Sequence, residues 1–205
     1  MRKTGLRMMM GALGFAAMPA LAGESVKVGS PAPDFVATDS NGQAVRLADF
    51  KGKEVVLEWT NDGCPYVGKW YGSGAMQNLQ REAAKLGAVW LTIASSAPGE
   101  QGYVDAAQAN ADTKDRNADP AHVLLDPKGA IGRLYGAQTT PHIFVITADG
   151  AIAYMGGADS IATTRIEDMQ RAEPYAREAL EAVAAGKPVE HAVTRPYGCS
   201  VKYSS

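Results

Sequence analysis

Short apolar runs alternate along the chain with longer stretches in which apolar positions recur every three or four residues. The runs are rich in β-branched and aromatic side chains and predict buried strands, whereas the longer stretches predict amphipathic helices. Strands are predicted at 55–59, 88–93, 122–125, 142–146 and 151–154, and helices at 65–86 (interrupted near Gly72 and Gly74), 103–116, 130–135 and 165–185. Strands that alternate with helices indicate an α/β fold with a central mixed sheet and helices on both faces.

Turn residues and prolines mark where the predicted elements begin and end. Ser40-Asn41-Gly42 and Asp149-Gly150 each lie between two apolar runs, so both are predicted to close β-hairpins. Pro174 is expected to disturb the last predicted helix. We expect one domain at 23–188 with an N-terminal β-hairpin extension, followed by a tail at 189–205 without clear periodicity.

Residues 1–22 have the features of a secretory signal peptide. Basic residues precede an apolar stretch at 8–20, which ends in the small-x-small cleavage signal Ala20-Leu21-Ala22. The apolar stretch is short for a membrane span, which disfavours an uncleaved anchor. We therefore expect cleavage after Ala22 and export to the periplasm, where two cysteines pair or are cycled by a reductant.

The composition is that of an ordinary globular protein and excludes several functions. Of the 205 residues, 46% are hydrophobic, and 20 Lys and Arg residues nearly balance 22 Asp and Glu residues. No basic run follows the N-terminal segment, so neither nucleic acid nor an anionic membrane is an expected partner. His122, His142 and His191 lack ligand-like spacing with the cysteines, and no phosphate-binding glycine motif occurs, so we predict no metal and no organic cofactor.

Cys64 is the strongest candidate for a catalytic residue. It follows the predicted strand 55–59 through the connection Thr60-Asn61-Asp62-Gly63 and precedes Pro65, a favoured first residue of a helix. Unpaired backbone N–H groups and the helix dipole stabilise a thiolate at a helix N-terminus and lower the pKa of the cysteine there. The carboxylate of Asp62 opposes this effect. A nucleophilic Cys64 is favoured over the alternative, a buried and inert cysteine.

A second signal is Thr139-Thr140-Pro141, directly before the strand at 142–146. A proline that opens a central strand needs a cis bond or an outward-facing backbone. The order of a strand, a Cys-Pro helix start and a Thr-Pro before a late hairpin resembles the thioredoxin fold. That resemblance implies that Pro141 lies against Cys64 and that this loop presents backbone groups to a bound chain. It implies substrate binding by Thr140, Pro141, Pro65 and Thr60. His142, next to Pro141, is more typical of an ordinary strand histidine than of a site residue.

Longer sequence segments resemble those of a known superfamily. Residues 28–35 and 47–53 resemble the opening of the redoxins, the alkyl hydroperoxide reductase / thiol-specific antioxidant superfamily. Within it, residues 58–61, 64–67 and 198–203 look like a peroxiredoxin-like branch. The resemblance implies a thiol-dependent oxidoreductase.

The chain also departs from the better-known relatives. Val67 stands where a thioredoxin dithiol would have its second cysteine, which excludes local Cys-x-x-Cys exchange. Asn61 stands where a peroxiredoxin carries threonine, and Pro141 about where it carries arginine. These departures favour thiol–disulfide exchange over peroxide reduction. The arginines that could supply a charge by folding back, each more typical of the surface, are Arg133, Arg165 and Arg195.

Cys199 is the other thiol of the sequence and lies in the predicted tail. It could be a resolving cysteine that reaches Cys64 of its own or another subunit, a permanent bridge to Cys64, or a free thiol. The resolving role is favoured because a permanent bridge would silence the nucleophile, whereas a reductant can reset a transient one.

We therefore expect an exported redoxin that catalyses thiol–disulfide exchange, with Cys64 as nucleophile and Cys199 as resolving cysteine. Its expected partners are a protein or small-molecule thiol, disulfide or peroxide, and an external thiol reductant. Two alternatives remain open at this point: a peroxiredoxin-like thiol peroxidase and a non-catalytic binding module that kept the thioredoxin fold.

Overall fold

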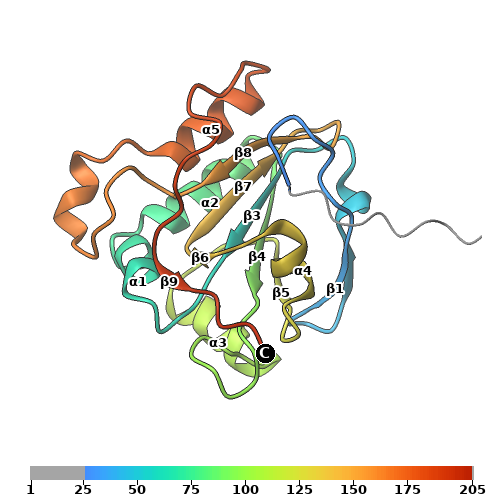
Figure 1. Ribbon diagram of the computed structural model, residues 1–205, viewed down its shortest axis with the longest axis vertical. Helices are drawn as coiled ribbons and strands as arrows, with labels where there is room; N and C mark the ends of the chain where they lie inside the picture. The colour runs from blue at the N-terminus through green and yellow to red at the C-terminus, as the bar shows by residue number, and fades with distance from the viewer. Residues whose placement is uncertain (1–25, 205) are drawn as a thin grey trace, which may run out of the picture.

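The computed structural model describes residues 26–204, so the predicted signal peptide at 1–22 lies outside the described residues (Figure 1). The strands are β1 (Val36–Asp39), β2 (Ala44–Arg46), β3 (Val55–Trp59), β4 (Val89–Ala94), β5 (His122–Leu125), β6 (Thr139–Thr140), β7 (His142–Ile146), β8 (Ile152–Gly156) and β9 (Cys199–Ser200). The helices are α1 (Pro65–Gly72), α2 (Ala75–Lys85), α3 (Ala106–Asp115), α4 (Ala130–Tyr135) and α5 (Tyr175–Ala184), with 3-10 helices η1 (Leu47–Phe50) and η2 (Ile166–Gln170).

A mixed sheet with the strand order β2-β1-β5-β4-β3-β7-β8 forms the centre of the described chain. β3 pairs in parallel with β4 and antiparallel with β7, so that Leu57 lies between Leu91 and Phe144. All five residues of β3 are buried. This strand therefore brings the chain out of the middle of the sheet into the connection that ends at Cys64.

The two faces of the sheet carry separate hydrophobic layers, because successive side chains of a strand point to opposite faces. On one face, Val56 and Val145 pack with buried side chains of α1, α2 and α5. On the other face, Leu57 and Phe144 pack with side chains of η1 and α4. The predicted mixed sheet with helices on both faces is confirmed, and the N-terminal hairpin β1–β2 joins that sheet through β5.

The single helix predicted at 165–185 is wrong. The structure has η2 at Ile166–Gln170 and α5 at Tyr175–Ala184, separated by an irregular segment that ends at Pro174. Proline has no backbone N–H and disfavours the helical region for the residue before it, so it begins α5 and does not continue a helix. The interruption expected in the helix at 65–86 lies at Ser73 and Gly74, between α1 and α2.

The C-terminal segment 189–204 lies against the body of the protein. In Figure 1 it runs, in red, from the end of α5 past β9 to the end of the chain near α3. β9 pairs antiparallel with β6 in a small second sheet. Val201 belongs to the main core, and the Tyr203 hydroxyl donates to Ala137 O at 2.7 Å. The sequence pattern did not predict this packing.

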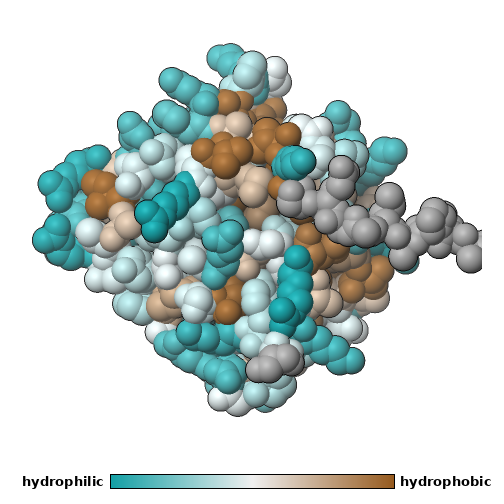
Figure 2. All heavy atoms as spheres, in the orientation of Figure 1, coloured by the Kyte–Doolittle hydropathy of each residue, from teal (hydrophilic) through white to brown (hydrophobic). Residues whose placement is uncertain are grey.

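The surface crossed by this segment is mixed in polarity. Figure 2 shows mainly polar and weakly polar side chains on this face, with hydrophobic side chains in small separate patches. Among residues 26–204, no helix has the length and hydrophobicity that a membrane crossing requires.

Candidate active site

Cys64 occupies the N-cap position of α1, directly after the connection from β3. Its backbone is extended, with φ −88° and ψ 118°, and Pro65 follows as the first helical residue. The Cys64 N–H donates to Asn61 O at 3.1 Å, and its carbonyl accepts from Gly68 N at 2.8 Å as the helix begins. The local sequence therefore fixes the sulfur at the start of the helix, as predicted. The residue is nevertheless buried, with 1% of its surface exposed.

The loop at Thr140 and Pro141 lies over the Cys64 sulfur. The Thr140–Pro141 peptide bond is cis. The Cys64 thiol donates to Thr140 O at 3.1 Å and makes no capping hydrogen bond to its own helix. The structure thus brings four of the predicted site residues together: Cys64, Pro65, Thr140 and Pro141.

Strand pairing brings Cys199 to the same place. In the β6–β9 pair, Thr140 lies opposite Cys199, and the Thr140 hydroxyl donates to Cys199 O at 3.4 Å. Cys199 packs against the hydrophobic cluster that contains Cys64, and both cysteines are free thiols. Cys199 is partly exposed, whereas Cys64 is buried.

This arrangement separates the pKa values of the two thiols. Burial alone would raise the pKa of Cys64, but hydrogen bonds from Cys199, Thr140 and the Val67 amide stabilise the thiolate, so the pKa is lowered from its ordinary value. The Thr140 carbonyl works the other way, because it accepts from the protonated thiol. Burial and the hydrogen bond that it donates to Cys64 raise the pKa of Cys199 to about 11.

The Asp62 carboxylate, expected from the sequence to oppose ionisation of Cys64, pairs with the Arg116 guanidinium. This positive charge counters the effect of Asp62 on the Cys64 thiol. Arg116 Nη1 also donates to the Thr60 hydroxyl at 3.5 Å, and Thr60 and Arg116 line a small depression beside α3. Thr60 therefore faces Arg116, apart from the four residues gathered around the Cys64 sulfur, and its role in substrate binding stays a prediction.

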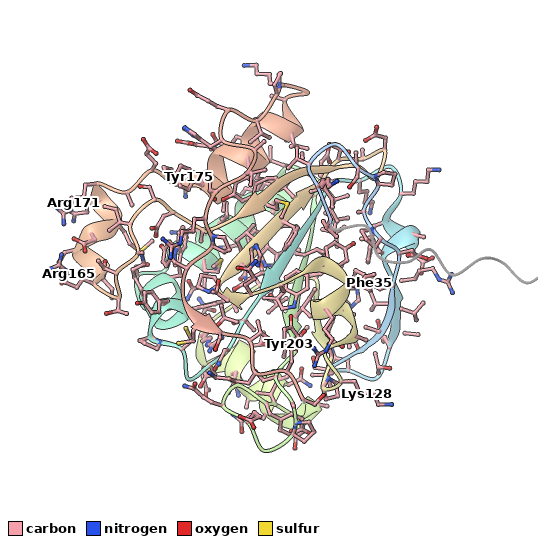
Figure 3. All side chains as sticks on the ribbon, in the orientation of Figure 1. Phe35, Lys128, Arg165, Arg171, Tyr175 and Tyr203 are labelled. Carbon is pink, nitrogen blue, oxygen red and sulfur yellow. The ribbon has the colours of Figure 1, made fainter. Side chains whose placement is uncertain are left out.

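Among residues 26–204, no hydrogen bond or ion pair joins Cys64 to the histidine or the arginines considered in the sequence analysis. His142 is buried among aromatic side chains, 4.7 Å from Phe144 between ring centroids, and burial lowers its pKa to about 4. Arg133 stacks on Tyr203, and Arg165 pairs with Asp168. Figure 3 shows Arg165 at the outer end of η2, away from the sheet. Arg195 lines a cleft beside the C-terminal segment.

One group near the site was missed by sequence analysis. Lys69 of α1 is fully buried, and its Nζ donates to Asp159 Oδ2 at 2.8 Å, to Ile161 O at 3.1 Å and to the Tyr197 hydroxyl at 3.0 Å. Tyr197 also donates to Asp159. The cluster ties α1 to the C-terminal segment two residues before Cys199. The sequence carries no signal for it, because a lone lysine in a helix is usually solvent-exposed.

Residues 26–204 contain no group of three or more side chains that could together bind a metal ion. The described residues combine a central mixed sheet, a cysteine at the start of α1 and a cis proline beside that cysteine. Known proteins were compared with the chain as a whole. The Redoxin family model matches residues 27–172. The chain belongs to the Redoxin family. The match includes Cys64 and Pro141 and ends before Cys199.

Relatives of known name agree with the expectation of a thiol-dependent oxidoreductase. Thiol-disulfide oxidoreductase ResA of Bacillus subtilis (strain 168) is 31% identical over 128 residues, which cover 57% of this chain and 72% of the relative. A structure of a hypothetical protein from Sinorhizobium meliloti 1021 matches with a TM-score of 0.74 at 23% identity, covering 89% of this chain and 97% of that chain.

Two further solved structures show the same fold with different names. A putative thiol:disulfide interchange protein DsbE from Chlorobium tepidum has a TM-score of 0.52 at 26% identity and covers 64% of this chain and 85% of its own. Peroxidoxin BcpB from Mycobacterium tuberculosis has a TM-score of 0.54 at 21% identity and covers 77% and 98%. The thioredoxin-like fold is thereby confirmed.

Proposed function

We propose that this redoxin catalyses thiol–disulfide exchange and cycles between a Cys64/Cys199 dithiol and a Cys64–Cys199 disulfide. The observation that carries the proposal is the β6–β9 pairing, which puts Cys199 opposite Thr140, the residue whose carbonyl accepts from the Cys64 thiol. The names of the ResA relatives support the same class of reaction.

The chemistry of the cycle needs two sulfurs and no cofactor. When the dithiol meets a substrate disulfide, one protein thiolate attacks a substrate sulfur and the first substrate thiolate leaves. The second protein sulfur then attacks the mixed disulfide, and the second substrate thiolate leaves. The substrate gains two electrons and two protons from the protein, and an external thiol reductant then supplies two more of each to convert the Cys64–Cys199 disulfide back to the dithiol.

The residues around the pair have distinct positioning roles. Pro65 begins the helix whose N-terminus stabilises the Cys64 thiolate, and the Thr140 carbonyl holds the thiol when it is protonated. Pro141 fixes the loop that brings Thr140 and, through β6, Cys199 to the sulfur. In the proposal, Pro65, Thr140 and Pro141 also bind the substrate, together with Thr60, which lies beside Arg116.

Exchange is favoured over peroxide reduction by the surroundings of the thiol. A peroxidatic cysteine needs a positive or hydrogen-bonding group that binds the peroxide oxygens beside the sulfur. Among residues 26–204, no arginine is hydrogen-bonded or ion-paired at Cys64, and the position taken by threonine in peroxiredoxins is Asn61. The features of residues 1–22 support export, and we place the reaction in the periplasm.

Turnover of a protein disulfide such as insulin, with dithiothreitol as reductant, tests the proposal. We expect catalysis by the wild-type protein, loss of it in Cys64→Ser and in Cys199→Ser, and full activity in Ser200→Ala, a matched change on the same strand. A peroxide assay run in parallel should show no comparable turnover. Wild-type protein that does not accelerate disulfide reduction would overturn the proposed function and leave a binding module with this fold.

A further inference from the structure

We infer that Cys199, and not Cys64, is the sulfur at which external thiols enter and leave the disulfide of the proposed cycle. The inference rests on the proposed function. It means that an incoming thiolate attacks Cys199 Sγ in the Cys64–Cys199 disulfide, and that the mixed disulfide with the substrate forms at Cys199.

Access to the two sulfurs is unequal. Cys64 is 1% exposed and is enclosed by Thr140, by Cys199 and by the hydrophobic layer under α1. Cys199 is partly exposed. A cleft of about 590 Å³ is lined by Thr139, Asp159, Tyr197 and Gly198, and Gly198 directly precedes Cys199 in the chain. In this inference, an external thiol approaches Cys199 from the side of the cleft.

The edge along which a substrate chain could reach Cys64 is already occupied. β9 pairs antiparallel with β6, with Thr139 opposite Ser200 and Thr140 opposite Cys199. Gly198 approaches the Thr140 carbonyl so closely that a Cβ at that position would lie 2.0 Å from Thr140 O. The protein's own strand therefore takes the backbone groups beside the cis proline, and it carries its own cysteine to the buried sulfur.

The C-terminal segment is anchored on both sides of Cys199. Before it, the Thr194 hydroxyl accepts from Gly157 N at 3.0 Å, and Tyr197 bonds to Lys69 and Asp159. After it, the anchors are Val201 N to Gln138 O at 3.0 Å, Ala97 N to Lys202 O at 2.8 Å and the Tyr203 hydroxyl to Ala137 O at 2.7 Å. Figure 3 shows Tyr203 against the α4 side of the molecule. Displacement of β9 by each substrate would break anchors from both groups, so the segment stays in place during turnover.

Leaving-group chemistry favours the same sulfur. Thiol–disulfide exchange proceeds faster when the departing thiolate has the lower pKa. Attack on Cys199 Sγ expels Cys64, whose thiolate the Val67 amide and the Thr140 side chain still stabilise when Cys199 carries the substrate. Attack on Cys64 Sγ would expel Cys199, whose pKa burial raises.

Reduction of the Cys64–Cys199 disulfide takes two steps. An external thiolate bonds to Cys199 Sγ, the Cys64–Cys199 bond breaks, and Cys64 leaves as a thiolate. A second external thiolate attacks the sulfur of the bound substrate, forms the external disulfide and releases Cys199, which takes up a proton. By reversal, oxidation of the protein forms the mixed disulfide at Cys199 first, and the Cys64 thiolate then attacks Cys199 Sγ and expels the substrate thiolate.

Mapping of the mixed disulfide tests the inference. Oxidised protein is mixed briefly with limiting reduced glutathione or with a single-cysteine peptide, quenched with acid to stop sulfur migration, and digested for mass spectrometry. We expect the adduct on Cys199 with either probe, in excess over Cys64 by about tenfold or more when extrapolated to zero time.

The experiment distinguishes failure of this inference from failure of the proposed function. An adduct mainly on Cys64 with either probe would overturn the inference and leave the proposed exchange intact. Protein that forms no Cys64–Cys199 disulfide under mild oxidation would overturn the proposed function, and the inference with it.

Discussion

Substitution of Gly198 by alanine tests whether the C-terminal segment covers Cys64. The added Cβ would lie 2.0 Å from Thr140 O and 2.7 Å from Thr140 C, where ordinary contact begins near 3.4 Å. β9 must therefore retreat from β6 by roughly 1 Å or more. Gly198 also has φ +144°, which a residue with a Cβ rarely adopts.

The expected magnitude follows from these two costs. Overpacking and backbone strain together cost about 2 kcal/mol, which is about a 30-fold change in the equilibrium between the covered and the open site. If iodoacetamide reaches Cys64 only through the open state, the alkylation rate of Cys64 in the reduced protein rises by about the same factor.

The assay is timed alkylation at fixed pH, followed by peptide mapping of both cysteines. Gly87→Ala is the matched control, because Gly87 has φ +84° and no atom within 4 Å of the added Cβ. The control should leave the Cys64 rate unchanged. The reasoning is refuted if Gly198→Ala folds normally and its Cys64 reacts at the wild-type rate, or if wild-type Cys64 already reacts like an unfolded thiol.

Three further predictions concern ionisation and stability. Cys199→Ala removes a hydrogen bond to the Cys64 thiolate, so the pH profile of Cys64 alkylation should shift to higher pH, and Cys199→Ser, which keeps a donor, should shift it less. Lys69→Met leaves the Asp159 carboxylate buried without its partner and should cost about 3–5 kcal/mol in the free energy of unfolding by denaturant. Burial raises the pKa of Glu58, so the folded state holds this proton more tightly than the unfolded chain. The stability this contributes is present at low pH and is lost as pH rises through the folded pKa, and Glu58→Gln should remove this decline in denaturant titrations at several pH values.

Lys187→Met, at an exposed lysine, should change the free energy of unfolding little, and an equal loss in Lys69→Met and Lys187→Met would contradict a buried ion pair. An unchanged pH profile in Cys199→Ala would contradict the hydrogen bond to Cys64. Wild-type and Glu58→Gln proteins with parallel pH dependence would contradict the raised pKa of Glu58.

Local patterns predicted the elements that depend on local interactions. The strands at 55–59, 122–125 and 142–146 and the helix at 130–135 have the predicted boundaries, because turn residues and apolar runs define them within a short window. The single helix predicted at 165–185 was wrong because the disturbance expected at Pro174 is a complete break, with η2 before it and α5 after it.

The candidate site divides in the same way. The position of Cys64 at a helix start could be predicted, because Pro65 and the preceding strand determine it. The pairing of Cys199 with Thr140 could not be predicted. β6 and β9 are each two residues long, and they pair only because the folded chain brings two segments together that are far apart in the sequence. Likewise, the ion pair of Asp62 with Arg116 joins residues far apart in sequence, so the electrostatic effect of Asp62 could not be judged beforehand.

The most direct test of the account is a redox titration of the wild-type protein against glutathione or dithiothreitol buffers, with alkylation and peptide mapping at each potential. The account predicts one reversible two-electron transition in which Cys64 and Cys199 become unreactive together, joined in a disulfide within one chain. Two cysteines that oxidise independently, or a Cys64 that is converted to sulfinic acid while Cys199 stays a free thiol, would contradict it.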